Sequence, residues 1–174
     1  GQVCSSGTRL IVQSSIADDF VDALVVRACT IRMGDGLDPT SETGPLVSQA
    51  QLDKMHAYVA SAKDEGAVLR CGGGRPDRDD LDPGGYFFSP TIFDHCDRSM
   101  TIVRDETFGP ILTVERFETE EQALALGNDT EYGLAGYVSG ADIEAARGLA
   151  RRIRAGWVTI NHAFDLNAPF GGYK

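Results

Sequence analysis

Apolar residues along the chain follow two spacings that alternate from one end to the other. Short runs rich in β-branched residues, typical of strands, are separated by stretches in which apolar residues return every three or four positions, typical of amphipathic helices. The runs predict strands or extended segments at 8–12, 68–71, 86–93, 111–114, 133–138 and 157–160. The periodic stretches predict helices that start near positions 15, 48, 119 and 143.

Two of these helix starts have the sequence of a capping box. Ser48 stands three positions before Gln51, and Thr119 stands three positions before Gln122. In a capping box each of the two side chains satisfies a backbone N–H at the start of the helix. The helix after Ser48 is expected to end at Gly66, because glycine readily adopts the left-handed conformation that follows a helix.

Each of the first two helices is expected to bury one apolar stripe. The stripe of the first helix is predicted to consist of Phe20, Leu24 and Ala28, with Val21 and Val25 beside it. The stripe of the second helix is predicted to consist of Leu52, Met55, Val59 and Ala62.

The order of the elements predicts the fold class. Strands that alternate with helices and have no polar face are typical of a parallel or mixed sheet covered on both sides. The sequence therefore predicts an α/β fold, with a mostly parallel open sheet and helices on both faces. A length of 174 residues is enough for a single domain with a sizeable core.

The charge balance excludes several kinds of partner. There are 16 Lys and Arg against 26 Asp and Glu, which gives a formal net charge of −10. Such a charge repels nucleic-acid phosphates and anionic lipid surfaces, so neither partner is expected. No apolar run approaches the ~20 residues of a membrane span, and no signal peptide is recognisable. We expect a cytoplasmic protein.

The cysteines and histidines do not form a metal-binding pattern. The sequence has no C-x-x-C or H-x-x-x-H pair, so no metal is expected. Cys29 and Cys71 are interpreted as small core residues, on the apolar side of a helix and in a strand. Cys4 lies among small polar residues just before the first strand, where a substrate could approach its sulfur. Spacing alone favours a structural role for Cys4 and leaves a nucleophile as the alternative.

Four motifs, taken together, resemble the NAD(P)-dependent aldehyde dehydrogenase superfamily. They are Gly1-Gln2-x-Cys4, Glu106-x-Phe108-Gly109-Pro110, Asn128-Asp129-x-x-Tyr132-Gly133-Leu134-Ala135 and Pro169-Phe170-Gly171-Gly172-Tyr173-Lys174. The resemblance covers the whole chain and implies the fold of that family's catalytic domain. It also implies that residues 1–174 are the cysteine-bearing part, with the nucleotide-binding and oligomerisation segments outside it.

The resemblance implies a reaction in which Cys4 attacks an aldehyde. A thiohemiacetal forms, hydride passes to the nicotinamide of NAD or NADP, and a thioester on sulfur is hydrolysed to the acid. The backbone N–H of Cys4 would stabilise the oxyanion. The family's partner asparagine and its general-base glutamate have no matching positions in this sequence. The 174 residues alone are therefore expected to be inactive.

Four further residues receive roles from the resemblance. Glu106 would accept hydrogen bonds from the nicotinamide ribose, and Phe108 would pack beside it, so both would bind the cofactor. Phe164 and Phe170 would line the aldehyde tunnel. The alternatives are a solvated carboxylate for Glu106 and ordinary packing for the three aromatic rings.

Two other functions remain as alternatives. The chain could be a stand-alone cysteine hydrolase or acyltransferase, which needs a histidine within hydrogen-bonding reach of Cys4. It could also be a non-catalytic interaction module with exposed apolar surface. For the dehydrogenase, the expected partner is a small aldehyde, and the full-length protein is expected to form homodimers or homotetramers.

Overall fold

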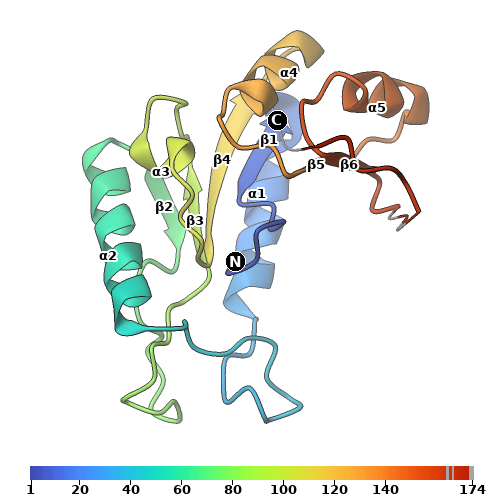
Figure 1. The fold of residues 1–174 in the computed structure, drawn as a ribbon. Helices are drawn as coiled ribbons and strands as arrows, with labels where there is room; N and C mark the ends of the chain where they lie inside the picture. The colour runs from blue at the N-terminus through green and yellow to red at the C-terminus, as the bar shows by residue number, and fades with distance from the viewer. Residues whose placement is uncertain (164, 166, 173–174) are drawn as a thin grey trace.

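The protein consists of a four-stranded sheet with helices and a smaller two-stranded unit beside it (Figure 1). The computed structural model describes residues 1–163, 165 and 167–172. The strands of the larger sheet are β1 (Arg9–Gln13), β2 (Val68–Cys71), β3 (Thr91–Asp94) and β4 (Ile111–Phe117), in the order β1-β4-β3-β2. β4 pairs in parallel with β1 and with β3, whereas β2 runs antiparallel to β3. The prediction of an α/β fold with a mostly parallel sheet is confirmed.

Helices cover both faces of the larger sheet. The helices around it are α1 (Ser14–Cys29), α2 (Gln49–Asp64), α3 (Thr101–Arg104) and α4 (Glu120–Asn128). Successive side chains of β3 point to opposite faces. Ile92 packs with α1, whereas Phe93 packs with α2 and α3. Figure 1 shows α1 and α2 on either side of these strands.

The buried stripe of α1 differs from the prediction. Ala17, Val21 and Ala28 are buried, and Leu24 packs against them, but Phe20 is 46% exposed. Val21, Leu24 and Ala28 stand four, seven and eleven positions after Ala17, so all four residues lie on one face of the helix. Phe20 lies about 100° round the axis from Val21, so it falls outside the face that meets the sheet.

The helix starts and stops follow the predicted signals. The Ser48 hydroxyl accepts a hydrogen bond from the Gln51 N–H at the start of α2, and Thr119 and Gln122 form the complete capping box of α4. Gly66 has φ +95°, so the chain turns there directly after α2. The apolar residues 100–103 lie at and in α3, which is a single helical turn. Met100, Ile102 and Val103 are buried in the part of the core that α2 covers.

The second unit contains β5 (Ala135–Val138), α5 (Ile143–Ala150) and β6 (Trp157–Ile160). β5 and β6 pair in parallel, and the buried residues Val138, Ala146 and Ala150 form their own small core. Figure 1 shows this unit, in orange and red, to one side of the larger sheet. The sequence predicts these elements, but it contains no signal that separates them from β1–β4.

Asp94, at the end of β3, is fully buried and holds two arginines. Its carboxylate pairs with Arg70 at 3.1 Å and with Arg116 at 2.8 Å, and it accepts a hydrogen bond from the His95 N–H. Burial acts to raise the pKa of Asp94, but the hydrogen bonds from Arg116 and His95 outweigh it and lower the pKa. This cluster joins β2, β3 and β4 at one edge of the core.

None of the helices in the described residues is both long enough and apolar enough to cross a bilayer.

Candidate active site

Cys4 lies in an exposed turn that leads into β1. The turn is closed by a hydrogen bond of 2.9 Å from the Ser6 N–H to the Val3 carbonyl. Within the described part of the chain, the Cys4 N–H has no hydrogen-bond partner. A sulfur and a free N–H are therefore both available at one residue. The role of Cys4 as the nucleophile stays a prediction.

Three distant segments hold this turn in place. Gly1 lies so close to the backbone of Gly109 that a Cβ on Gly1 would be 1.9 Å from the Gly109 carbonyl oxygen. The side chain of Gln2 accepts a hydrogen bond of 3.2 Å from the Val47 N–H. On the other side, the Tyr137 hydroxyl donates a hydrogen bond of 2.6 Å to the Ser5 carbonyl. The turn thus lies between the larger sheet and the β5–β6 unit.

The contact with Gly109 brings the Cys4 segment beside the loop of residues 106–110. In this loop Phe108 is half-buried and has φ +53°, a conformation uncommon for a residue with a side chain. Gly109 follows, and a Cβ there would be 2.1 Å from Met55 Sδ. The loop is therefore pressed against α2, and a side chain at position 109 would force Met55 to move. Strained residues of this kind are concentrated at functional sites.

Helix α2 supplies two side chains that hold this loop. Gln51 donates from its amide to the carbonyls of Thr107 at 3.1 Å and Phe108 at 2.8 Å. Lys54 donates to the Glu106 carbonyl at 3.0 Å. Gln51 was expected to complete the capping box with Ser48, but its side chain turns to the loop instead. Sequence patterns gave no sign of this role, because it depends on a partner 56 residues away.

Glu106 and Thr107 have unused hydrogen-bonding capacity. Glu106 is exposed, and its carboxylate makes no hydrogen bond or ion pair with any described residue. The Thr107 hydroxyl is buried and without a partner in the same part of the structure. A free carboxylate can accept from two hydroxyls at once. The role that the resemblance implies for Glu106, accepting from the nicotinamide ribose, stays a prediction.

Phe170 lies on the second unit. Its ring packs edge-on against Trp157 at 6.4 Å between centroids, and a Cβ on Gly156 would be 2.2 Å from it. Phe170 remains 53% exposed, and no described contact joins it to Cys4. Phe164, the other aromatic residue predicted to bind substrate, lies outside the described residues. Both roles stay predictions.

Two of the three histidines make contacts elsewhere, and His162 lies exposed just after β6. His56 packs edge-on against Phe88 at 5.4 Å, and His95 lies 3.9 Å from Asp94. Among the described residues, no hydrogen bond joins the Cys4 sulfur to a histidine. The hydrolase alternative therefore lacks its required base in this structure. No group of three His, Cys, Asp or Glu in the described residues could hold a metal ion.

The interpretation of Cys29 as a core residue is wrong. Cys29 is exposed at the C-terminal end of α1, although the preceding Ala28 is buried against the sheet. Cys71 is half-buried, as expected of a small core residue, and Cys96 is buried. Burial raises the pKa of Cys96 to about 11.

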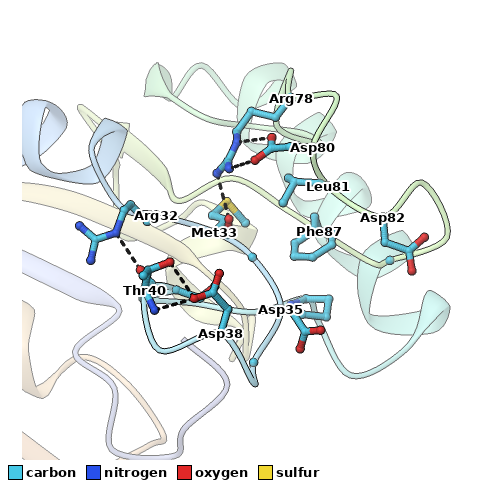
Figure 2. Close-up of a pocket in the computed structure, with 15 residues that line it drawn as sticks. Arg32, Met33, Asp35, Asp38, Thr40, Arg78, Asp80, Leu81, Asp82 and Phe87 are labelled. Atoms are coloured by element: carbon cyan, nitrogen blue, oxygen red, sulfur yellow. Dashed lines mark hydrogen bonds and ion pairs between the residues drawn. The ribbon is translucent and has the colours of Figure 1, made fainter.

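A pocket of about 670 Å³ lies between the loop after α1 and the loop after β2 (Figure 2). Its polar side chains are paired among themselves: Arg78 binds Asp80 and the Met33 carbonyl, and Arg32 donates to the Thr40 carbonyl. None of its lining residues belongs to the Cys4 turn or to residues 106–110. The pocket is therefore separate from the candidate active site.

Known proteins are similar to this chain over its whole length. A sequence profile of the aldehyde dehydrogenase family matches residues 1–174. The betaine aldehyde dehydrogenase of Bacillus subtilis is 48% identical over 176 residues, covering 100% of this chain and 36% of that protein. The betaine aldehyde dehydrogenase of Brucella anthropi is 46% identical with the same coverage.

A solved structure shows the same fold. The crystal structure of betaine aldehyde dehydrogenase from Staphylococcus aureus in complex with NAD+ matches with a TM-score of 0.93 and 49% identity. The match covers 99% of this chain and 35% of that one. The chain thus spans about a third of the length of the relatives it matches. With a family profile that matches all its residues, the chain belongs to the aldehyde dehydrogenase family.

Proposed function

We propose that residues 1–174 are the cysteine-bearing part of an enzyme that oxidises an aldehyde to a carboxylic acid with NAD. The observation that carries the proposal is the position of the Cys4 turn. It is exposed, and it touches the backbone of Gly109 beside Glu106 and Phe108. A nucleophile and a cofactor loop have to meet in this way for hydride transfer.

The proposed cofactor residues are Glu106 and Phe108. The free carboxylate of Glu106 accepts hydrogen bonds from the ribose hydroxyls, and the Phe108 ring packs beside the ribose and nicotinamide. The support for this is the unpartnered carboxylate and the fixed, left-handed conformation of Phe108. What NAD supplies when bound is a hydride acceptor. NADP remains the alternative cofactor.

The proposed chemistry of the chain's own residues is centred on Cys4. The Cys4 thiolate adds to the aldehyde carbon, and its own N–H donates to the oxygen that becomes negative in the thiohemiacetal. After oxidation the acyl group stays on Cys4 as a thioester until water releases the acid. Phe164 and Phe170 are proposed to form an apolar wall that keeps bulk water from the aldehyde.

The test removes the sulfur in a polypeptide that carries this chain together with the remaining length of its relatives. Betaine aldehyde is the first substrate to try, because it gives the curated relatives their names. NADH formation by the Cys4→Ala variant should fall about a thousandfold or more. The matched control is Cys29→Ser, which alters another exposed cysteine and should keep full activity. Activity of Cys4→Ala close to wild type would overturn the proposal.

The 174 residues alone are proposed to be inactive, because the nucleotide-binding segments and the general base are proposed to lie elsewhere. Incubation of the isolated chain with NAD and a panel of aldehydes should produce no NADH; turnover would contradict this. We also propose a cytoplasmic enzyme that forms dimers or tetramers. Cell fractionation and analytical ultracentrifugation of the longer protein test these two points.

A further inference from the structure

Two cysteines outside the candidate active site meet at the ends of α1 and β2. Cys29 is the last residue of α1, and Cys71 is the last residue of β2. Helix α1 packs against β2, and Cys71 packs against the same core cluster that contains Ala28, the neighbour of Cys29. Cys29 also lines one small pocket with Gly72, the residue after Cys71, so the two cysteines are neighbours in space.

The two sulfurs differ in their access to solvent. Cys29 is exposed and lines a pocket of about 270 Å³ together with Gly72, Ser89 and Pro90. Cys71 is half-buried, and its thiol donates to the Pro90 carbonyl at 3.7 Å. A small oxidant can therefore reach Cys29 first, while the less accessible Cys71 is available as the second thiol.

We propose that Cys29 and Cys71 form a peroxide-sensitive thiol pair that closes into a disulfide, separate from Cys4. An accessible cysteine beside a second, resolving cysteine is the usual arrangement of such sites. The two thiols come from elements that are already packed together, as a disulfide requires. The proposal does not depend on the dehydrogenase function.

The reaction balances with one hydroperoxide as the oxidant. The Cys29 thiolate attacks the peroxide, an S–O bond forms, the O–O bond breaks, and the leaving oxygen takes a proton to become water or an alcohol. Cys71 then attacks the sulfur of the Cys29 sulfenic acid, an S–S bond forms, and the S–O bond breaks. The hydroxide takes the proton of Cys71 and leaves as water. The two thiols lose two electrons, and the peroxide gains them.

The pH dependence of closure follows from the environment of Cys71. Burial is the main cause that raises the pKa of Cys71, and the neighbouring Cys29 adds to it. The thiolate of Cys71 is therefore scarce at neutral pH, and the second step is expected to become faster as the pH rises. With the Cys71 thiol slow to react, the sulfenic acid on Cys29 should persist long enough to be trapped at neutral pH.

The test maps disulfides in the folded protein after treatment with hydrogen peroxide. Trypsin separates the four cysteines, because Cys4, Cys29, Cys71 and Cys96 fall in peptides 1–9, 28–32, 71–78 and 79–98. Mass spectrometry without reduction should show peptide 28–32 linked to 71–78, and dithiothreitol should separate them. Free Cys29 and Cys71 after treatment, or a link that forms only in urea, would overturn the proposal.

Single substitutions separate the two roles. Cys71→Ser should abolish the linked peptide and leave Cys29 as a sulfenic acid that dimedone labels. Cys29→Ser should abolish both the link and the labelling, since the first thiol is gone. The control Cys96→Ser removes a buried thiol away from the pair and should leave the link unchanged. Pairing of Cys29 with Cys4 or with a second molecule would contradict the assignment.

Discussion

At the scale of single residues, the four cysteines differ in what surrounds them. Cys4 and Cys29 are exposed, whereas Cys96 is buried and has its pKa raised to about 11. Since the thiolate is the reactive form, iodoacetamide should modify Cys4 and Cys29 at least about tenfold faster than Cys96 at pH 8. A time course of peptide masses measures the three rates. A Cys4 that reacts no faster than Cys96 would contradict the proposed nucleophile.

Gly109 is a second residue at which a substitution should have a measurable effect on stability. A methyl group at this position would be 2.1 Å from Met55 Sδ, inside the core under α2. Gly109→Ala should lower the free energy of unfolding by about 1–3 kcal/mol, the usual cost of overpacking. Urea denaturation followed by circular dichroism measures it.

The matched control for Gly109→Ala is Gly36→Ala. A Cβ at Gly36 meets nothing within 4 Å, so this variant should unfold at nearly the wild-type urea concentration. Equal effects of the two substitutions would show that the loop of residues 106–110 is not packed as described.

At the scale of elements, Asp94 connects three strands of the larger sheet. It is fully buried and pairs with Arg70 from β2 and Arg116 from β4. Asp94→Asn removes the buried charge partner of Arg70 and Arg116, which keep only Asp22 and Asp18 at the surface, so the free energy of unfolding should fall by about 2 kcal/mol. Chemical denaturation at pH 7 checks this value.

The same carboxylate predicts part of the acid sensitivity. The pKa of Asp94 is lowered in the folded protein, so its contribution to stability is complete above the ordinary carboxyl pKa of about 4. That contribution is lost as the pH falls through the folded-state pKa. Stability of Asp94→Asn should therefore vary less than that of the wild type below about pH 4. If the free energy of unfolding fell equally with pH in both proteins below about pH 4, the prediction would be wrong.

Helices and strands could be predicted from the sequence where the residues that mark them are close together in the chain. The stripe of Met55, Val59 and Ala62, the cap at Thr119 and the stop at Gly66 depend on residues a few positions apart. What could not be predicted depends on distant partners. The orientation of α1 that exposes Phe20 and Cys29 is set by the sheet, and the separation of β5 and β6 from β1–β4 is set by packing.

The candidate site divides in the same way. Motif resemblance pointed to Cys4, Glu106 and Phe108, and the structure brings their two segments into contact. The residues that hold those segments, Gln51 and Tyr137, were not predicted. Their contacts are made across the fold by an amide and a hydroxyl, which carry no distinctive spacing in the sequence.

At the scale of the whole molecule, Tyr137 links the two sheets at the Cys4 turn. Its hydroxyl donates to the Ser5 carbonyl at 2.6 Å, and its ring packs 3.7 Å from where a Cβ on Gly7 would be. Tyr137→Phe keeps the ring and removes the hydrogen bond, which is worth about 1 kcal/mol.

The turn should then become looser, so Cys4 should react with iodoacetamide about fivefold faster, as a change of about 1 kcal/mol implies. Cys29 in the same molecule is the internal reference and should keep its rate. Thermal unfolding of the larger sheet should change little. An unchanged ratio of Cys4 to Cys29 reactivity would show that this hydrogen bond does not restrain the turn.

The Gln51 amide donates to the carbonyls of Thr107 and Phe108, so it links the first turn of α2 to the loop of residues 106–110. Local unfolding of one of these two segments therefore affects the other. When the first turn of α2 frays, the loop that carries Glu106 loses its support, even though the rest of the fold stays closed. Amide protons of that first turn should therefore exchange more slowly with deuterium once a nucleotide occupies the loop. Occupancy of the proposed cofactor site would then be readable from a helix end that never touches the ligand.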